Sequence, residues 1–138
     1  MKTTLVQPYL FFGGRCEAAL EFYRTALGAQ VDFLIRFKES PEPNTPGLQP
    51  GFENKVMHTT FHIGGTTLMA SDGCSEVANF GGFSLSLALP TEAEAHQAFA
   101  ALAVGGTVGL PLTKTFWSPC FGMLTDQFGI NWMVTIQP

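Results

Sequence analysis

The sequence predicts an α+β fold in which two βαβββ modules pair into a curved mixed sheet with a central cleft. Two segments, residues 7–28 and 84–105, each have the pattern of a strand, a turn, a helix and a glycine stop. A shift of 77 positions aligns their landmarks. The aligned pairs are Leu10 with Leu87, Phe12 with Leu89, Ala18 with Ala95, Phe22 with Phe99, Gly28 with Gly105, and Val31 with Val108. We expect one domain, residues 1–138, with internal modules at about residues 5–72 and 83–137.

The first module begins with a strand at residues 7–12, whose aromatic and aliphatic side chains suit a half-buried pleated surface. Gly13 and Gly14 end this strand. A helix follows over residues 15–27, because apolar residues recur there at helical spacing, and Gly28 supplies its C-terminal stop. The apolar stripe consists of Cys16, Ala19, Leu20, Tyr23 and Leu27. Further strands are predicted at residues 31–37, 55–63 and 66–71, the last two joined by a Gly64-Gly65 turn.

A loop separates the second and third of these strands. Residues 38–54 contain four prolines, which exclude regular structure. A loop of this length inside a compact domain is either a lid or partner contact, or a surface excursion without function.

The second module repeats the order. We expect a strand at residues 83–89 and then a helix that opens at Pro90 and Thr91, with Thr91 as N-cap and Glu94 completing a capping box. Its apolar stripe is Ala95, Ala98, Phe99 and Leu102, and its stop is Gly105-Gly106. Strands follow at residues 107–112, about 116–126, and 131–136, with Phe128-Gly129 at the last hairpin turn.

The composition limits the partners. Charged residues make up 13% of the chain, against roughly 25% in a typical soluble domain. This shortage favours a homodimer that buries part of the surface, the alternative being a polar uncharged surface. The net charge of −4 and the lack of a basic block argue against nucleic-acid binding. No apolar run approaches the roughly 20 residues of a membrane span, and no secretory leader is evident, so a cytoplasmic location is expected.

The three cysteines indicate neither a disulfide framework nor a zinc site. Their odd number and wide spacing argue against disulfides, and no Cys-x-x-Cys pair suggests zinc. Cys16 stands near a predicted helix N-terminus, which could lower its pKa and make it reactive. The alternative is a small, partly buried residue.

Four phrases resemble the vicinal-oxygen-chelate superfamily, also called the glyoxalase/bleomycin-resistance/dioxygenase fold, and within it the PhnB-like branch. They are PYLFFGGRCEAALEFYRTALGA, VMHTTFHIGGTTLMASDG, GFSLSL and FGMLTDQFGINWM. The superfamily includes isomerases, dioxygenases, epimerases, thiol transferases and metal-free drug-binding proteins. Some PhnB-like members carry a demethylubiquinone methyltransferase label. We expect no methyltransferase here, because no glycine-rich loop opens a helix in a parallel sheet.

The resemblance also implies four cleft-facing ligand positions in metal-dependent members. In this sequence they are Gln7, Ser84, Met69 and Met133. One amide, one hydroxyl and two thioethers are poor ligands for magnesium, manganese, zinc or nickel. We therefore expect neither an obligatory metal nor another cofactor.

The best catalytic candidate is His58. By strand alternation His58, Thr60 and His62 share one face, which we expect to line the cleft. Either histidine could act as a general base near neutral pH, or could be a hydrogen-bonded structural residue. Their Cα atoms should lie about 13 Å apart, too far to share one ion easily.

Other charged residues have two interpretations each. Asp72 and Asp126 are either acids at the mouth of the cleft or residues that hold turns through their side chains. Arg15 and Arg36 either recognise an anionic substrate by forked hydrogen bonds or are solvated surface charges.

We predict that the protein binds a small, largely apolar molecule in the cleft. The aromatic residues, among them Tyr9, Phe116 and Trp117, would line the pocket, or else pack in the core or a dimer interface. The predicted binding residues are Gln7, Tyr9, His58, Thr60, Met69, Ser84, Phe116, Trp117 and Met133. The alternative function is a divalent-metal-dependent lyase or dioxygenase-like enzyme that uses His58. A third is a protein-contact role for residues 38–54.

Overall fold

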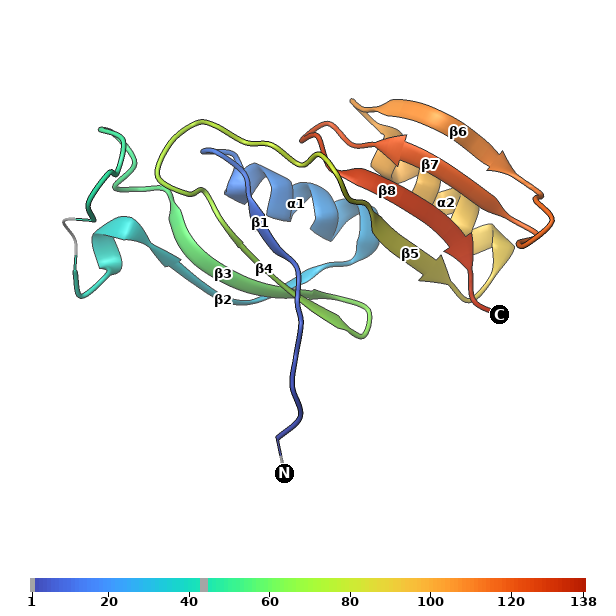
Figure 1. Ribbon diagram of the computed structural model, residues 1–138, viewed down its shortest axis with the longest axis horizontal. Helices are drawn as coiled ribbons and strands as arrows, with labels where there is room; N and C mark the ends of the chain where they lie inside the picture. Colours follow the sequence, from blue (N-terminus) through green and yellow to red (C-terminus); the bar gives the residue numbers. More distant parts are fainter. Residues whose placement is uncertain (1, 43–44) are drawn as a thin grey trace. The chain divides into compact units, whose positions relative to one another are not determined.

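The chain divides into two compact units, each built around its own sheet. The computed structural model describes residues 2–42 and 45–138. The units are Met1–Ala78 and Asn79–Pro138, so the boundary falls in the polar connector between the predicted modules. Within the described residues each unit contains one α-helix and one four-stranded sheet, and Figure 1 shows the helix of each unit packed beside its sheet.

The first unit contains β1 (Tyr9–Phe11), α1 (Cys16–Leu27), β2 (Gln30–Arg36), β3 (Val56–Ile63) and β4 (Thr66–Ser71). Its strand order is β1-β4-β3-β2, with β1 parallel to β4 and the other pairs antiparallel. α1 covers one face of this sheet, with Cys16, Ala19, Leu20 and Tyr23 buried beneath it (Figure 1). Among the described residues of this unit, no α-helix covers the opposite face of the sheet.

The second unit repeats this topology. It contains β5 (Leu85–Leu89), α2 (Glu92–Ala103), β6 (Thr107–Thr113), β7 (Phe121–Thr125) and β8 (Asn131–Ile136). The strand order is β5-β8-β7-β6, again with only the first pair parallel. The predicted α+β class with two βαβββ modules is therefore confirmed, while their pairing around a central cleft stays a prediction.

The two helices do not follow the 77-position shift that relates the first two strands of the units. The buried stripe of α1 coincides with that of α2 (Ala95, Ala98, Phe99 and Leu102) at a shift of 79. The predicted alignments of Ala18 with Ala95 and of Phe22 with Phe99 are wrong, because Ala18 is exposed whereas Ala95 is buried. Relative to its stripe, α2 begins one turn earlier than α1 does.

Different N-terminal caps accompany the two helix starts. The side chain of Thr91 accepts a hydrogen bond from the backbone N–H of Glu94 at 3.2 Å, which confirms the predicted N-cap of α2. The N-cap residue of α1, Arg15, makes no side-chain cap hydrogen bond. Gly28 ends α1 with a left-handed φ of 70°, a conformation that glycine adopts without a Cβ clash.

Two predicted strands are too long. β1 lacks Gln7, although the carbonyl of Pro8 accepts a hydrogen bond from Met69 N–H at 3.0 Å. β7 begins at Phe121 rather than at residue 116. Residues 115–118 form a turn instead, closed by the bond from Thr115 N–H to Ser118 O at 2.8 Å. Phe116 and Trp117 therefore lie in a connection and not in a strand.

The proline-rich loop is tied to the first unit. It opens with a short 3-10 helix, Phe37–Glu39, and Lys38 N–H donates to Glu53 O at 2.9 Å. Phe52 is buried, and Gln49 N–H donates to Cys74 O at 2.7 Å. Within this loop Pro43 and Asn44 lie outside the described residues. These bonds fix the base of the loop, and its role stays a prediction.

No helix among residues 2–42 and 45–138 combines the length and the apolar character that a membrane crossing requires.

Candidate functional site

The helix-free face of the first sheet carries a row of side chains in register. Tyr9 on β1 pairs with Met69 on β4, Met69 pairs with Thr60 on β3, and Thr60 pairs with Phe33 on β2. Phe11 and His58 lie on the same face, because each stands two residues from a member of the row on its own strand. We call these six residues the aromatic face: Tyr9, Phe11, Phe33, His58, Thr60 and Met69.

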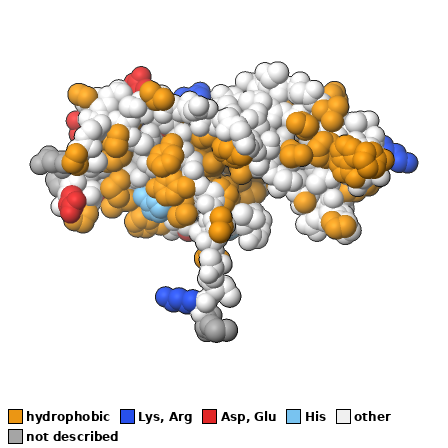
Figure 2. Space-filling model, viewed as in Figure 1, with side chains coloured by type: hydrophobic (Ala, Val, Ile, Leu, Met, Phe, Trp, Pro, Cys, Tyr) orange, Lys and Arg blue, Asp and Glu red, His pale blue; other side chains and the backbone are white. Residues whose placement is uncertain are grey.

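The rings of the aromatic face form a continuous exposed surface. Tyr9 stacks on Phe11 with ring centroids 5.0 Å apart. His58 lies 5.6 Å from Tyr9 and 6.3 Å from Phe33, again between ring centroids. Tyr9, Phe11 and Phe33 are 39%, 51% and 52% exposed. Figure 2 shows hydrophobic side chains gathered around a histidine on this side of the first unit.

Both ring nitrogens of His58 are within hydrogen-bond distance of a hydroxyl. The Tyr9 hydroxyl lies 2.9 Å from Nδ1, and Thr60 Oγ1 lies 3.3 Å from Nε2. Burial, with a smaller contribution from Cys16, raises the pKa of Tyr9, so its hydroxyl keeps its proton at neutral pH. With the tautomer that carries hydrogen on Nε2, Tyr9 donates to His58 and His58 donates to Thr60. The arrangement is a polar chain set among apolar rings.

The predicted binding residues divide between the two units. The first sheet brings Tyr9, His58, Thr60 and Met69 together, and Gln7 precedes its first strand. Ser84 precedes β5, and Met133 pairs with Ser86 and Met123 in the second sheet.

Phe116 and Trp117 of the second unit do not lie in the strand that the sequence predicts for them. Phe116 and Trp117 are 97% and 59% exposed, in the connection from β6 to β7. Phe33 was missed by sequence reasoning, because a register shift between Val31 and Phe33 resets which β2 side chains share a face.

His62 takes a different partner from His58. Its Nδ1 lies 3.0 Å from a carboxylate oxygen of Asp32, in an exposed pair. The two histidines share a strand face as predicted, but they do not form one site.

The carboxylates of the two buried aspartates accept hydrogen bonds from backbone N–H groups. Asp72 Oδ1 accepts from Gly14 N–H at 2.9 Å and from Cys16 N–H at 2.8 Å, while Oδ2 accepts from Val56 N–H at 2.8 Å. Asp126 accepts from Phe128 and Ile130 N–H and from the Trp132 indole, at 2.8, 3.1 and 2.9 Å. Of the two predicted interpretations, the geometry therefore favours side chains that hold turns.

Cys16 is not an activated thiol. It is fully buried, and burial raises its pKa, with further contributions from the Asp72 and Glu17 carboxylates. Of the two interpretations of Cys16, the structure favours the small buried residue. The helix N-terminus does not lower the pKa of the thiol, because burial opposes ionisation and the Asp72 carboxylate, which accepts the N–H of Cys16, adds to that effect.

Arg36 is committed to a contact within the first unit. Its guanidinium forms a forked pair with Glu17, with Nη2 3.0 Å from Oε2, and also donates to the carbonyl of Asn54 at 2.9 Å. The hydrogen bond from Arg36 lowers the pKa of Glu17, burial opposes this lowering, and the charge of Arg36 adds to it. These bonds occupy the fork that an anionic substrate would need.

The Glu17–Arg36 pair makes stability weakly pH-dependent. Because the pKa of Glu17 is lowered in the folded state, the pair stabilises the fold above the unfolded value of about 4.3. The contribution is lost as the pH falls through the folded value, and in this exposed position it should stay below about 1 kcal/mol. In an NMR titration, Arg36→Gln should raise the Glu17 pKa toward 4.3. Arg24→Gln should leave it unchanged, and an unaltered Glu17 pKa in Arg36→Gln would contradict the assignment.

A separate depression of about 480 Å³ lies on the first unit at the start of α1. Its lining is Phe12, Gly13, Gly14, Arg15, Phe52, Lys55, Glu76 and Ala78. The ammonium of Lys55 donates to the carbonyl of Gly14 at 2.9 Å, and Asp72 takes the amides of Gly14 and Cys16. The helix N-terminus therefore already holds a carboxylate of the chain itself.

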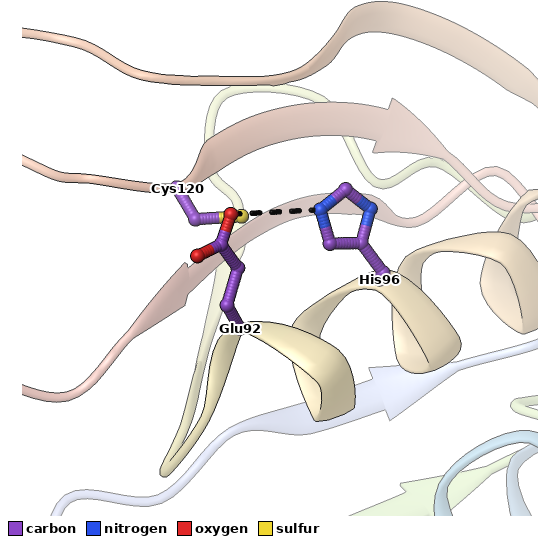
Figure 3. A group of neighbouring side chains, drawn as sticks. All are labelled: Glu92, His96 and Cys120. Carbon is purple, nitrogen blue, oxygen red and sulfur yellow. Dashed lines mark ion pairs between the residues drawn. The ribbon is translucent and has the colours of Figure 1, made fainter.

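Three potential metal ligands meet in the second unit. Glu92, His96 and Cys120 place one ligand atom each within 4.8 Å of one another (Figure 3). Glu92 and His96 stand four residues apart on α2, a spacing that could have marked the pair in the sequence. Cys120 is distant in sequence, so no local pattern adds it.

Comparison with known proteins agrees with this architecture. Residues 4–135 match the family model described as 3-demethylubiquinone-9 3-methyltransferase. The protein YjdN of Escherichia coli (strain K12) is 33% identical and is covered over 94% of its length and 95% of this chain.

Solved structures are similar over nearly the whole chain. The protein PA1353 from Pseudomonas aeruginosa is 38% identical, with a TM-score of 0.85 and 98% of both chains covered. A PhnB protein from Bacillus cereus, described as a putative 3-demethylubiquinone-9 3-methyltransferase, is 26% identical, with a TM-score of 0.79, and 97% of this chain and 100% of that chain are covered. A glyoxalase-related enzyme from Fulvimarina pelagi shares the fold at 18% identity and a TM-score of 0.65, over 99% of this chain and 90% of that chain.

Proposed function

Because this chain belongs to the 3-demethylubiquinone-9 3-methyltransferase family and has the glyoxalase/bleomycin-resistance fold, we propose that it binds a small, largely apolar molecule on the aromatic face. The observation that carries the proposal is a set of three rings, each 39% to 52% exposed: Tyr9 stacks on Phe11, and His58 links Tyr9 to Phe33. Contiguous exposed apolar surface of this kind commonly marks a ligand-binding or interaction site.

The polar chain within the aromatic face supplies an anchor. The hydroxyls of Tyr9 and Thr60 flank the His58 ring, and each retains capacity for a further hydrogen bond. A carbonyl or hydroxyl on the ligand can therefore bind beside its apolar part. A ring-bearing apolar compound, such as the quinone in the family's description, has this combination of groups.

The side chains of the aromatic face are weak metal ligands, which favours binding of the small molecule without an obligatory metal. Met69 offers a thioether, and Tyr9 and Thr60 offer neutral hydroxyls, none of which is a strong ligand for a divalent ion. His58 would have to give up one of its two hydroxyl partners to coordinate an ion. The metal-dependent lyase or dioxygenase alternative is for this reason the weaker one.

We do not extend the proposal to methyl transfer. Fold does not determine chemistry, and the described sheets are mixed and mostly antiparallel. Nucleotide-type donors bind at the carboxyl ends of parallel strands, an arrangement that differs from both sheets here.

The uncharged fluorescent probe N-phenyl-1-naphthylamine tests the proposal. We expect saturable binding that Phe11→Ser and Phe33→Ser each weaken about fivefold to tenfold. The estimate follows from the half-exposed rings, since burying the rest of a phenylalanine contributes roughly 1 kcal/mol. Fluorescence titration of the purified variants measures the dissociation constants.

Val77→Ser is the matched control, because Val77 is 80% exposed in the same unit but lies outside the aromatic face. Its affinity for the probe should equal that of the wild type, and dialysis against EDTA should leave binding intact. Equal affinities in all three variants, or binding that requires a divalent ion, would refute the proposal.

A further inference from the structure

The cluster of Glu92, His96 and Cys120 lies in the second unit and shares no residue with the aromatic face. Figure 3 shows the three side chains pointing toward one another, two from α2 and one from the residue before β7. His96 Nε2 lies 3.9 Å from Glu92 Oε1, and the three potential ligand atoms all lie within 4.8 Å of one another. Small rotamer changes bring such atoms to the separations found around one ion.

The early start of α2 creates the cluster. At the shift of 79 that superimposes the buried stripes, Glu92 corresponds to Gly13, which precedes α1, and His96 corresponds to Glu17. The extra first turn, capped by Thr91, therefore places a carboxylate that the first unit cannot offer. The cluster is a feature of one module and not a consequence of the duplicated fold.

Cys120 is held in place by its neighbours. Its N–H donates to Ser118 Oγ at 3.2 Å, and Ser118 Oγ donates to the Cys120 carbonyl at 2.9 Å. Ser118 Oγ also lies 2.9 Å from Thr135 Oγ1 on β8, which connects this segment to the sheet. The thiol is thus a fixed, buried ligand, whereas Glu92 and His96 are 63% and 59% exposed and free to adjust.

The donor set selects the metal. Thiolate, imidazole and carboxylate together suit zinc, which binds cysteine, histidine and acidic residues in tetrahedral sites. Magnesium and calcium prefer oxygen ligands alone, so a cysteine and a histidine disfavour them. Three protein ligands leave one tetrahedral position, and the exposure of Glu92 and His96 opens it to water.

We propose that Glu92, His96 and Cys120 bind one zinc ion, with water as the fourth ligand, and that the ion ties the first turns of α2 to the start of β7. Binding converts the Cys120 thiol to a thiolate and releases its proton to the solvent. The zinc ion stabilises the second unit, because it binds the folded arrangement of three residues that are separated in the unfolded chain.

Metal titration of the chelator-treated full chain tests this proposal. Competition with a chromophoric chelator should show one zinc ion per chain. His96→Gln and Cys120→Ser should each weaken binding on the order of 100-fold or more, since even the loss of a residue that only supports a ligand costs 10- to 100-fold. Cobalt(II) should add a thiolate-to-metal absorption band, absent in Cys120→Ser. Zinc should also raise the melting temperature of the wild type more than that of His96→Gln.

Matched controls separate this site from other donors. His62→Gln, Cys74→Ser and Glu94→Gln remove a histidine, an exposed thiol and a neighbouring carboxylate outside the cluster, and each should bind zinc as the wild type does. His96 is exposed, so His96→Gln reports on the site even if Cys120→Ser fails to fold. Wild-type zinc affinity in His96→Gln, or no stoichiometric zinc binding by the wild type, would overturn the proposal.

Discussion

Asp72→Ala should lower the free energy of unfolding of the first unit by about 3–5 kcal/mol. The carboxylate is 1% exposed and accepts three backbone N–H bonds, from Gly14, Cys16 and Val56. Removing it leaves these donors without their acceptor, at a cost of about 1–3 kcal/mol for each buried group. The donors belong to the turn before α1, to its first residue and to the start of β3. Denaturant unfolding with a probe in the first unit measures the loss.

Asp32→Ala is the comparison for this change. Asp32 also carries a carboxylate in the first unit, but its contact with His62 is exposed. Its removal should alter stability by less than about 1 kcal/mol. If Asp72→Ala were as mild as Asp32→Ala, the three bonds would not hold the unit together as described.

Gly106→Ala should destabilise the second unit by about 3 kcal/mol. A Cβ on Gly106 would lie 2.2 Å from the carbonyl oxygen of Thr125 and 3.0 Å from Asp126 Cα. Both atoms belong to backbone, and Thr125 pairs with Thr107 at the start of β6, so the clash cannot be relieved by a side-chain rotation. Added groups in tightly packed positions typically cost 1–3 kcal/mol, and a backbone contact this short belongs at the upper end. Thermal and denaturant unfolding measure the effect.

Gly65→Ala provides the control in the hairpin between β3 and β4. Nothing lies within 4 Å of a Cβ at Gly65, and its φ is not in the left-handed region, which only Gly64 occupies in this turn. The substitution should change the free energy of unfolding by less than about 1 kcal/mol. Alanine fits this position without strain, and it slightly reduces the conformational entropy of the unfolded chain. Equal losses at Gly65 and Gly106 would show that lost glycine flexibility, and not crowding, is responsible.

Local sequence patterns were sufficient to predict the module order. Apolar spacing gave both helices, and glycine pairs marked the hairpin at Gly64-Gly65 and the end of α2. The helix alignment failed because the apolar stripe repeats every three to four residues, so a two-residue error still overlaps part of it. The extra turn of α2 depends on its cap at Thr91 relative to that stripe.

The candidate site was only partly predictable. Alternation correctly put His58 and Thr60 on one face, but strand order decides their neighbours. β4 separates β1 from β3, and the contact from Tyr9 to His58 therefore reaches across a strand. Phe33 lies on the aromatic face because the register of β2 is irregular. Cys120 lies close to His96 because of tertiary packing. Neither effect leaves a local signal in the sequence.

The two buried aspartates differ in how far along the chain they reach. Asp126 bonds Phe128, Ile130 and Trp132, two to six positions ahead, so these contacts can form as soon as that segment exists. Asp72 must find Cys16, 56 positions behind it. While the polypeptide is being synthesised, the start of α1 consequently waits for most of its unit to emerge before its amides gain a permanent acceptor. The contacts of Asp126 with its own hairpin carry no such delay, although the two modules share one topology.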